Sequence, residues 1–84
     1  DVRLDTEIVR LEQDFTVHPS RVEFTLRAQL VDVSERRVIA TKVFDEVENA
    51  PQENADGGVV AANEALQRLL AQVADFCIAE APRR

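Results

Sequence analysis

The sequence predicts an α+β domain: a three-stranded antiparallel sheet followed by one long C-terminal amphipathic helix that packs on one face. Three observations carry this prediction. Apolar residues alternate over positions 21–33, a short polar turn joins this segment to a second strand-like segment, and a helical repeat covers positions 54–80. The chain has 84 residues. This length indicates a single small domain, 1–84, with little core of its own.

The first predicted strand, residues 1–15, changes phase near its middle. Its first half places apolar or β-branched residues at even positions: Val2, Leu4, Thr6 and Ile8. Its second half places them at odd positions: Val9, Leu11 and Phe15. Side chains of a strand alternate with a period of two, so one face cannot bury both sets without an extra residue. We therefore expect a β-bulge or sharp bend near positions 8–10.

Residues 21–33 form the clearest predicted strand, with one apolar face made of Val22, Phe24, Leu26, Ala28 and Leu30. The polar turn at 34–37 makes residues 38–48 its hairpin partner. The third strand alternates weakly, with Val38, Ala40 and Phe44 expected on one face and Ile39, Thr41, Val43 and Val47 on the other. Two partly apolar faces indicate that the outer face is also covered, by another subunit or a missing part of the chain. A basic stripe of Arg21, Arg27 and Lys42 is expected on the outer sheet face, where interleaved carboxylates favour cross-strand pairing over nucleic-acid binding.

The helix predicted over residues 54–80 carries an apolar stripe at a spacing of three and four: Val59, Ala62, Leu66, Leu69, Val73 and Phe76. Asn54 or Asp56 is expected to cap its start, and Gly57-Gly58 to permit a tight turn. Pro82 and the basic Arg83 and Arg84 follow its expected end. Three further apolar residues lie beside this stripe, beyond what one contact with the sheet would cover, and form the candidate interface: Val60, Leu70 and Cys77. We expect a homodimer to complete the core.

The pattern gives no catalytic, cofactor-binding or metal-binding residue, and the protein is not expected to be an enzyme. A formal net charge of −6 argues against nucleic acid as a partner. The acidic cluster around positions 45–56 lacks the spacing of a calcium loop. Cys77, the only cysteine, is expected to be a buried thiol that acts as a small hydrophobe, with a reactive thiol as the alternative. His18, the only histidine, is expected in a loop.

Three segments together resemble a known family. They are the hairpin that contains Leu30, Asp32, Arg36, Ile39, Ala40-Thr41 and Phe44, the linker with Pro51, and the A-A-N-x-A-L pattern from Ala61 to Leu66. This combination is similar to the C-terminal half of the ABC-type transport auxiliary lipoproteins, which accompany Mce-type (MlaD-like) lipid transporters in Gram-negative bacteria. The family's lipid-bearing cysteine and N-terminal half have no counterpart here, and Cys77 lies inside the predicted helix. The resemblance therefore implies an excised C-terminal portion of a larger lipoprotein.

The resemblance also implies a function. The protein would be a non-enzymatic auxiliary component of an ABC-type transport system for lipid or another hydrophobic compound. It would lie in the periplasm, anchored to a membrane, such as the outer membrane, by an N-terminal lipid. Its partner would be an Mce-type transporter subunit, for which it would act as a structural adaptor. The alternative is a small-molecule or lipid carrier that binds an apolar ligand between the sheet and the helix.

Overall fold

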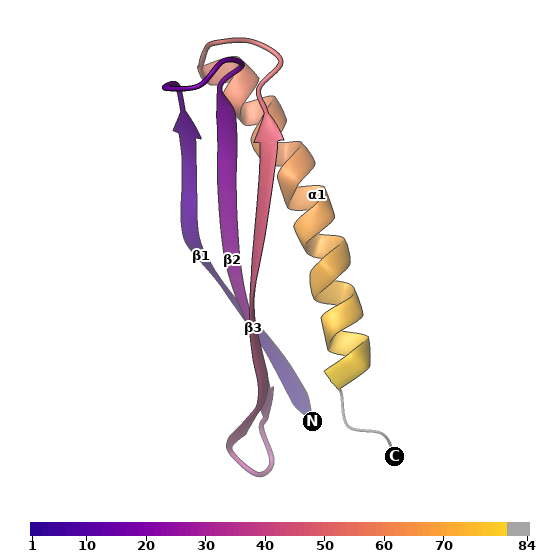
Figure 1. Ribbon diagram of the computed structural model, residues 1–84. Coiled ribbons are helices and arrows are strands. Elements are labelled where there is room, and N and C mark those ends of the chain that lie inside the picture. Colours follow the sequence, from indigo (N-terminus) through magenta and orange to yellow (C-terminus); the bar gives the residue numbers. More distant parts are fainter. Residues whose placement is uncertain (81–84) are drawn as a thin grey trace.

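The computed structural model describes residues 1–80. Strands β1 (Val2–Asp14), β2 (Arg21–Asp32) and β3 (Arg37–Asn49) form one antiparallel sheet in the order β1-β2-β3, and helix α1 (Ala55–Glu80) follows. The helix runs along one face of the sheet, which gives two layers (Figure 1). The predicted α+β architecture is confirmed. Pro82, Arg83 and Arg84, which the sequence places after the helix, lie outside the described residues.

The predicted β-bulge lies in the middle of β1. Ile8 pairs with Leu26, but the next pair is Arg10 with Thr25, so Val9 is an extra residue. The inserted residue changes the phase of the strand. Leu4, Ile8 and Leu11 consequently point to the same side of the sheet, although their positions differ in parity. The prediction drawn from the phase change is confirmed.

A second bulge, in β3, was not predicted. Ala40 pairs with Leu30 and Val38 pairs with Val31, which leaves Ile39 as the extra residue. Val38 therefore lies on the outer face of the sheet, and its expected place beside Ala40 on the helix side is wrong. Three consecutive apolar residues hide the phase change, because any one of them suits either face.

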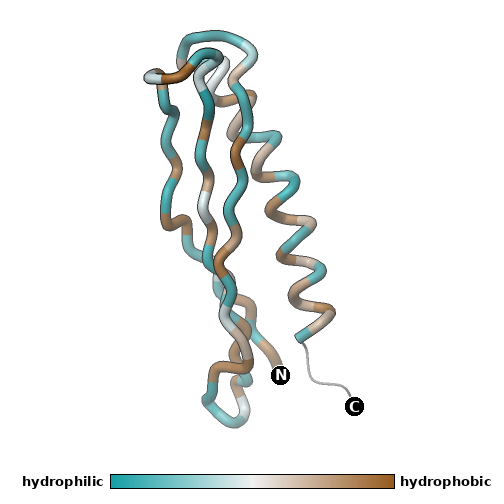
Figure 2. Tube along the Cα trace, viewed as in Figure 1, coloured by the Kyte–Doolittle hydropathy of each residue, from teal (hydrophilic) through white to brown (hydrophobic). Residues whose placement is uncertain are grey.

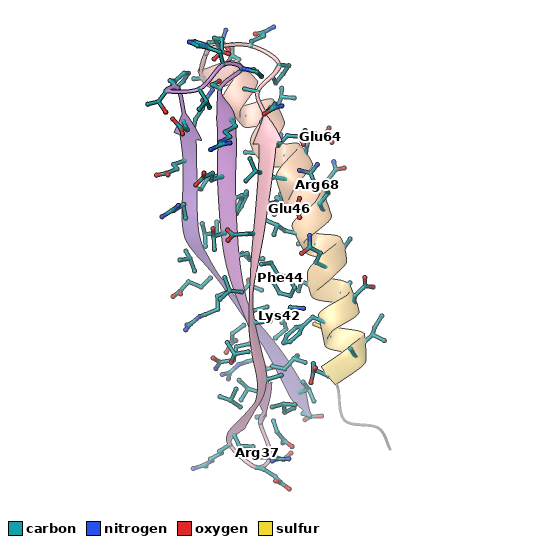
Figure 3. The ribbon with its side chains drawn as sticks, in the orientation of Figure 1. Arg37, Lys42, Phe44, Glu46, Glu64 and Arg68 are labelled. Carbon is teal, nitrogen blue, oxygen red and sulfur yellow. The ribbon has the colours of Figure 1, made fainter. Side chains whose placement is uncertain are left out.

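Lys42 also departs from the prediction. It pairs with Ala28, whose side chain is buried beneath the helix, so Lys42 lies on the helix side and not in an outer basic stripe. Its ammonium group lies 5.4 Å from the centre of the Phe44 ring, a cation–π arrangement that suits a long side chain at the edge of a core. Figure 3 shows both side chains on the side of β3 that faces α1.

The core lies between α1 and strands β2 and β3. The whole predicted apolar face of β2 is buried, and the Phe44 and Phe76 rings meet edge to face at 5.8 Å.

The buried residues of α1 are Gly57, Gly58, Ala61, Ala65, Leu69, Val73 and Phe76. The predicted stripe is therefore wrong in the N-terminal half of the helix: Val59 is 60% exposed, and Ala62 and Leu66 are only half-buried. Small residues bring this half close to the sheet, whereas a hydrophobic pattern gives most weight to the larger ones.

Asn54 caps the helix, as one of the two predicted alternatives. Its side-chain oxygen accepts a hydrogen bond of 2.8 Å from the amide of Gly57. Both glycines lie within the first helical turns, so the expected tight turn is wrong. A Cβ at Gly57 would overlap the backbone of Gln52, and one at Gly58 would overlap the side-chain amide of Gln13. The two glycines therefore allow α1 to start in close contact with the linker and with β1.

The described part of the chain is long and thin. It measures 48 × 18 × 16 Å, and its radius of gyration is 15.5 Å. A compact domain of this length would have a radius of gyration of about 12 Å. A single helix on one face of the sheet therefore leaves the core open to solvent on its other sides.

Candidate interaction surfaces

The two flanks of α1 differ in chemistry. Between Gly57 and Ala79 its only charged residues are Glu64, Arg68 and Asp75, whose spacings of four and seven place them on one side. This side faces β3. Arg68 Nε donates to Glu46 Oε1 at 2.6 Å and Gln72 Nε2 donates to Glu46 Oε2 at 2.7 Å. Figure 3 shows Glu46 and Arg68 pointing toward one another between β3 and α1.

These contacts form a polar clasp, defined by Glu46, Glu48, Arg68 and Gln72. Arg68 Nη2 also lies 2.9 Å from Glu48 Oε1. The hydrogen bonds from Arg68 and then from Gln72 lower the pKa of Glu46, since they stabilise its charged form. The hydrogen bond to Glu46 raises the pKa of Arg68. The clasp thus fixes the position of α1 along β3.

The opposite flank of α1 carries no charge. It is formed by residues spaced seven, four and seven apart: Val59, Leu66, Leu70 and Cys77. We call these four residues the uncharged flank. Its N-terminal end borders a shallow hollow of about 220 Å³, in which Val59 and Ala62 lie beside Leu11 and Gln13 of β1. The uncharged flank therefore faces the β1 side of the sheet.

On that side, no part of residues 1–80 covers the sheet. Leu4, Ile8 and Leu11 pair with Leu30, Leu26 and Phe24, so they point to the same side as the core. They are nevertheless 42%, 58% and 50% exposed. A helix about 10 Å across covers about two strands spaced 4.8 Å apart, and α1 lies over β2 and β3. Leu4, Ile8 and Leu11 thus form the floor of an open groove, and the uncharged flank forms its wall.

The structure places the candidate interface residues on or beside this wall. Leu70 (55% exposed) lies in the uncharged flank, and Val60 (49%) lies on the adjoining back of the helix. Cys77 is half-buried and packs against the core, so the expectation of a buried thiol holds in part. The floor residues were not proposed as part of the interface. Their alternation was visible in the sequence, but nothing there shows that one helix leaves β1 uncovered.

The outer face of the sheet offers a second surface. Val38, Val43 and Val47 are each about half exposed along β3, on the same face as Thr41 and Asp45, and we call the three valines the valine stripe. On the neighbouring strands the outer face is charged and paired: Arg10 lies 3.0 Å from Glu23. An ordinary solvated face carries polar residues throughout, so the valine stripe is an unusual feature of this surface.

The loops at the start of α1 form a structural cluster. The buried Ser20 donates its amide to Glu53 Oε1 at 2.8 Å, and its hydrogen bonds lower the pKa of Glu53. Gln13 Nε2 donates to Ser20 Oγ and to the carbonyl of Asn54. His18 lies in this loop region, as predicted, with Nδ1 3.8 Å from Glu53 Oε1. These bonds hold the β1–β2 loop, the β3–α1 linker and the helix start together.

Residues 1–80 contain no cluster of three or more histidine, cysteine or acidic side chains that could hold a metal ion. Within the same residues, α1 lacks the run of apolar sequence needed to cross a membrane.

The geometry defines a two-layer α+β fold, an antiparallel three-stranded sheet with one long helix on one face. The same fold occurs in the crystal structure of protein XCC0632 from Xanthomonas campestris, described under the family DUF330. The match has a TM-score of 0.87 at 20% sequence identity and covers 95% of this chain. This chain spans 47% of that protein, about half of its length. No protein-family model and no curated protein matches the sequence.

Proposed function

We propose that this protein is a non-enzymatic auxiliary component of an ABC-type transport system for lipid or another hydrophobic compound, acting as a structural adaptor for an Mce-type partner. The observation that carries an adaptor role is apolar surface left open on both faces of a thin sheet: the groove on one and the valine stripe on the other. Apolar patches of this kind mark protein interaction sites. The class of partner comes from the resemblance described above.

The valine stripe is the surface that we assign to the Mce-type partner. It lies on β3, which is an edge strand in the sheet that residues 1–80 form and has no strand of those residues on its outer side. Such an edge accepts a further strand by backbone hydrogen bonding, and side chains beside it set specificity. A periplasmic location and a lipid anchor follow from the same resemblance and belong to the same proposal.

Co-purification from the native cell envelope tests this proposal. The full-length protein that contains this chain is tagged and captured, and Mce-type proteins in the eluate are identified by mass spectrometry. The wild type should retain the partner, and a double variant, Val43→Glu with Val47→Glu, should lose it. Leu70→Glu, on the other face of the molecule, is the matched control and should retain it. Capture without an Mce-type protein, or equal capture by all variants, would contradict the proposal.

The second candidate, a carrier of an apolar ligand, is favoured by the hollow between β1 and α1. It is lined by Leu11, Val22, Val59 and Ala62 among others, and its volume is about 220 Å³. Sites for drug-sized ligands measure about 300–1,000 Å³, so this hollow suits only a short apolar segment. Native mass spectrometry of the purified protein separates the two functions. A carrier retains a lipid adduct, whereas an adaptor gives a mass without any adduct, whatever its number of chains.

A further inference from the structure

Three open uncharged surfaces meet along one side of the molecule. The floor of the groove (Leu4, Ile8 and Leu11) and the uncharged flank of α1 are two of them. The third is the back of α1, formed by Val60, Gln67, Ala71, Ala74 and Ile78, of which only Gln67 is polar and Ile78 is 77% exposed. A helix that serves only its own sheet carries polar residues on its back. With Gln67 as the single polar residue among five on its back, α1 favours cover on more than one side. Figure 2 shows hydrophobic positions recurring along the length of both β1 and α1.

The size of these surfaces fits a stable dimer. An interface of standard size takes about 800 Å² from each partner. Helix α1 has 26 residues and is about 39 Å long, so such an interface needs a strip about 20 Å wide. Half the circumference of a helix about 10 Å across, with one strand spacing of about 4.8 Å added, gives that width. The long, thin shape also leaves this strip continuous from one end of the molecule to the other.

The position of β1 decides how two copies could meet. If the sheets lay side by side in one plane, joined at β1, the two helices would be about 19 Å apart, or four strand spacings. Helices pack at about 8–10 Å, so that arrangement leaves both flanks open. The flanks touch only when two copies face each other, with the sheets outside and both helices between them. A twofold axis parallel to the helices then places the back of each α1 on the floor formed by the partner's β1.

The charges on α1 agree with this arrangement. Glu64, Arg68 and Asp75 all lie on the side toward the chain's own β3, so they stay outside the contact. Between Gly57 and Ala79, two copies of net charge −6 can therefore meet without bringing like charges together, and the remaining carboxylates of α1, Asp56 and Glu80, lie at its two ends. Along the contact, Val59, Leu66, Leu70 and Cys77 are spaced seven, four and seven residues apart, which keeps them on one side of the helix over most of its length.

From these observations we propose that the groove between β1 and α1 binds a second copy of this chain face to face, in a twofold-symmetric sandwich of sheet, two parallel helices and sheet. The contact is isologous: the flank of each α1 packs on the other flank, and each groove floor receives the partner's helix. This inference goes beyond the adaptor function, which uses the valine stripe on the opposite face.

Sedimentation equilibrium of the 84-residue chain tests the proposal. The wild type should be a dimer at micromolar concentration. Leu70→Glu puts two like charges at the centre of the seam and should give a folded monomer, with folding checked by circular dichroism. Val43→Glu adds the same charge to the outer face and should remain a dimer. Leu70→Ala should raise the dissociation constant about tenfold, which keeps the test decisive where Leu70→Glu does not fold.

A wild type that is a folded monomer at high micromolar concentration would overturn the proposal and leave the groove to another partner, such as further polypeptide in a longer protein. Equal dissociation of the Leu70→Glu and Val43→Glu variants would also overturn it. The adaptor function stands or falls separately, because its co-purification test depends on Val43 and Val47.

Discussion

The two flanks of α1 show two ways in which a helix lies on a sheet. Toward β3, Arg68 and Gln72 hold Glu46 with hydrogen bonds, and the contact is complete within the chain. Toward β1, Leu66 and Cys77 are only partly covered by the core and Leu70 is 55% exposed, and all three face a strand that the helix leaves open. The polar contact fixes the position of the helix but adds little to the free energy of unfolding. The apolar flank adds stability only when another surface covers it. The difference separates what this chain completes alone from what it offers to a partner.

Substitutions of the adjacent residues Leu69 and Leu70 test this difference, and they are expected to give the largest change in stability. Leu69 is fully buried in the core, so Leu69→Ala should lower the free energy of unfolding by about 2–5 kcal/mol. This loss should be the same at every protein concentration. Leu70→Ala should cost little in dilute solution and progressively more as the concentration rises, because its partner is a second chain. Urea unfolding at several concentrations measures both, and a Leu70→Ala loss that is independent of concentration would contradict the comparison.

Substitutions of Gly57 and Gly58, at the start of the helix, are expected to give the next largest change in stability. Gly57→Ala sets a Cβ against the Gln52 backbone, which cannot easily move, so we expect a loss of about 1–3 kcal/mol. Gly58→Ala sets a Cβ against the end of the Gln13 side chain, which can shift. A gain in helix propensity of about 1 kcal/mol should bring its net effect near zero. Urea unfolding of the two variants checks the order, and a larger loss for Gly58→Ala would contradict it.

A substitution in the polar clasp is expected to give the smallest change in stability, and this change should depend on pH. The pKa of Glu46 is lower in the folded protein than its ordinary value of 4.5. Its contribution to stability is therefore present above about pH 4.5 and is lost as the pH falls through the folded pKa. Glu46→Gln should cost at most about 1 kcal/mol at pH 7 and should flatten the loss of stability below pH 4.5. Unfolding free energies measured from pH 7 to 3 check this, and an unchanged acid limb would show that the clasp contributes nothing.

Much of the fold could be predicted from the sequence because strong local patterns agree with it. Val22 to Leu30 alternate without interruption, and the phase change in the first strand located the bulge at Val9. The bulge at Ile39 could not be located, because its neighbours are apolar as well. The stripe on α1 was displaced in its first half, since Gly58, Ala61 and Ala65 are buried by close approach and not by size.

The candidate site was predicted only on one element. Val60, Leu70 and Cys77 were singled out because they lie beside the main apolar stripe of the helix, and the structure places Leu70 and Cys77 on the groove side of α1 and Val60 on its back. The floor on β1 depends on which strands the helix covers. That is a property of the packed layers, and no residue pattern within β1 encodes it.

Oxidative cross-linking through Cys77 tests the face-to-face contact most directly. Parallel helices related by a twofold axis place the two copies of a seam residue opposite one another, and a disulfide needs Cα atoms about 4.4–6.8 Å apart. Mild oxidation of the wild type with diamide should therefore give a covalent dimer in high yield. A control chain with Cys77→Ala and Val43→Cys, whose thiol lies on the outer face, should stay a monomer on a non-reducing gel. Failure of the wild type to cross-link, or equal cross-linking of the control, would contradict the proposed contact between the uncharged flanks.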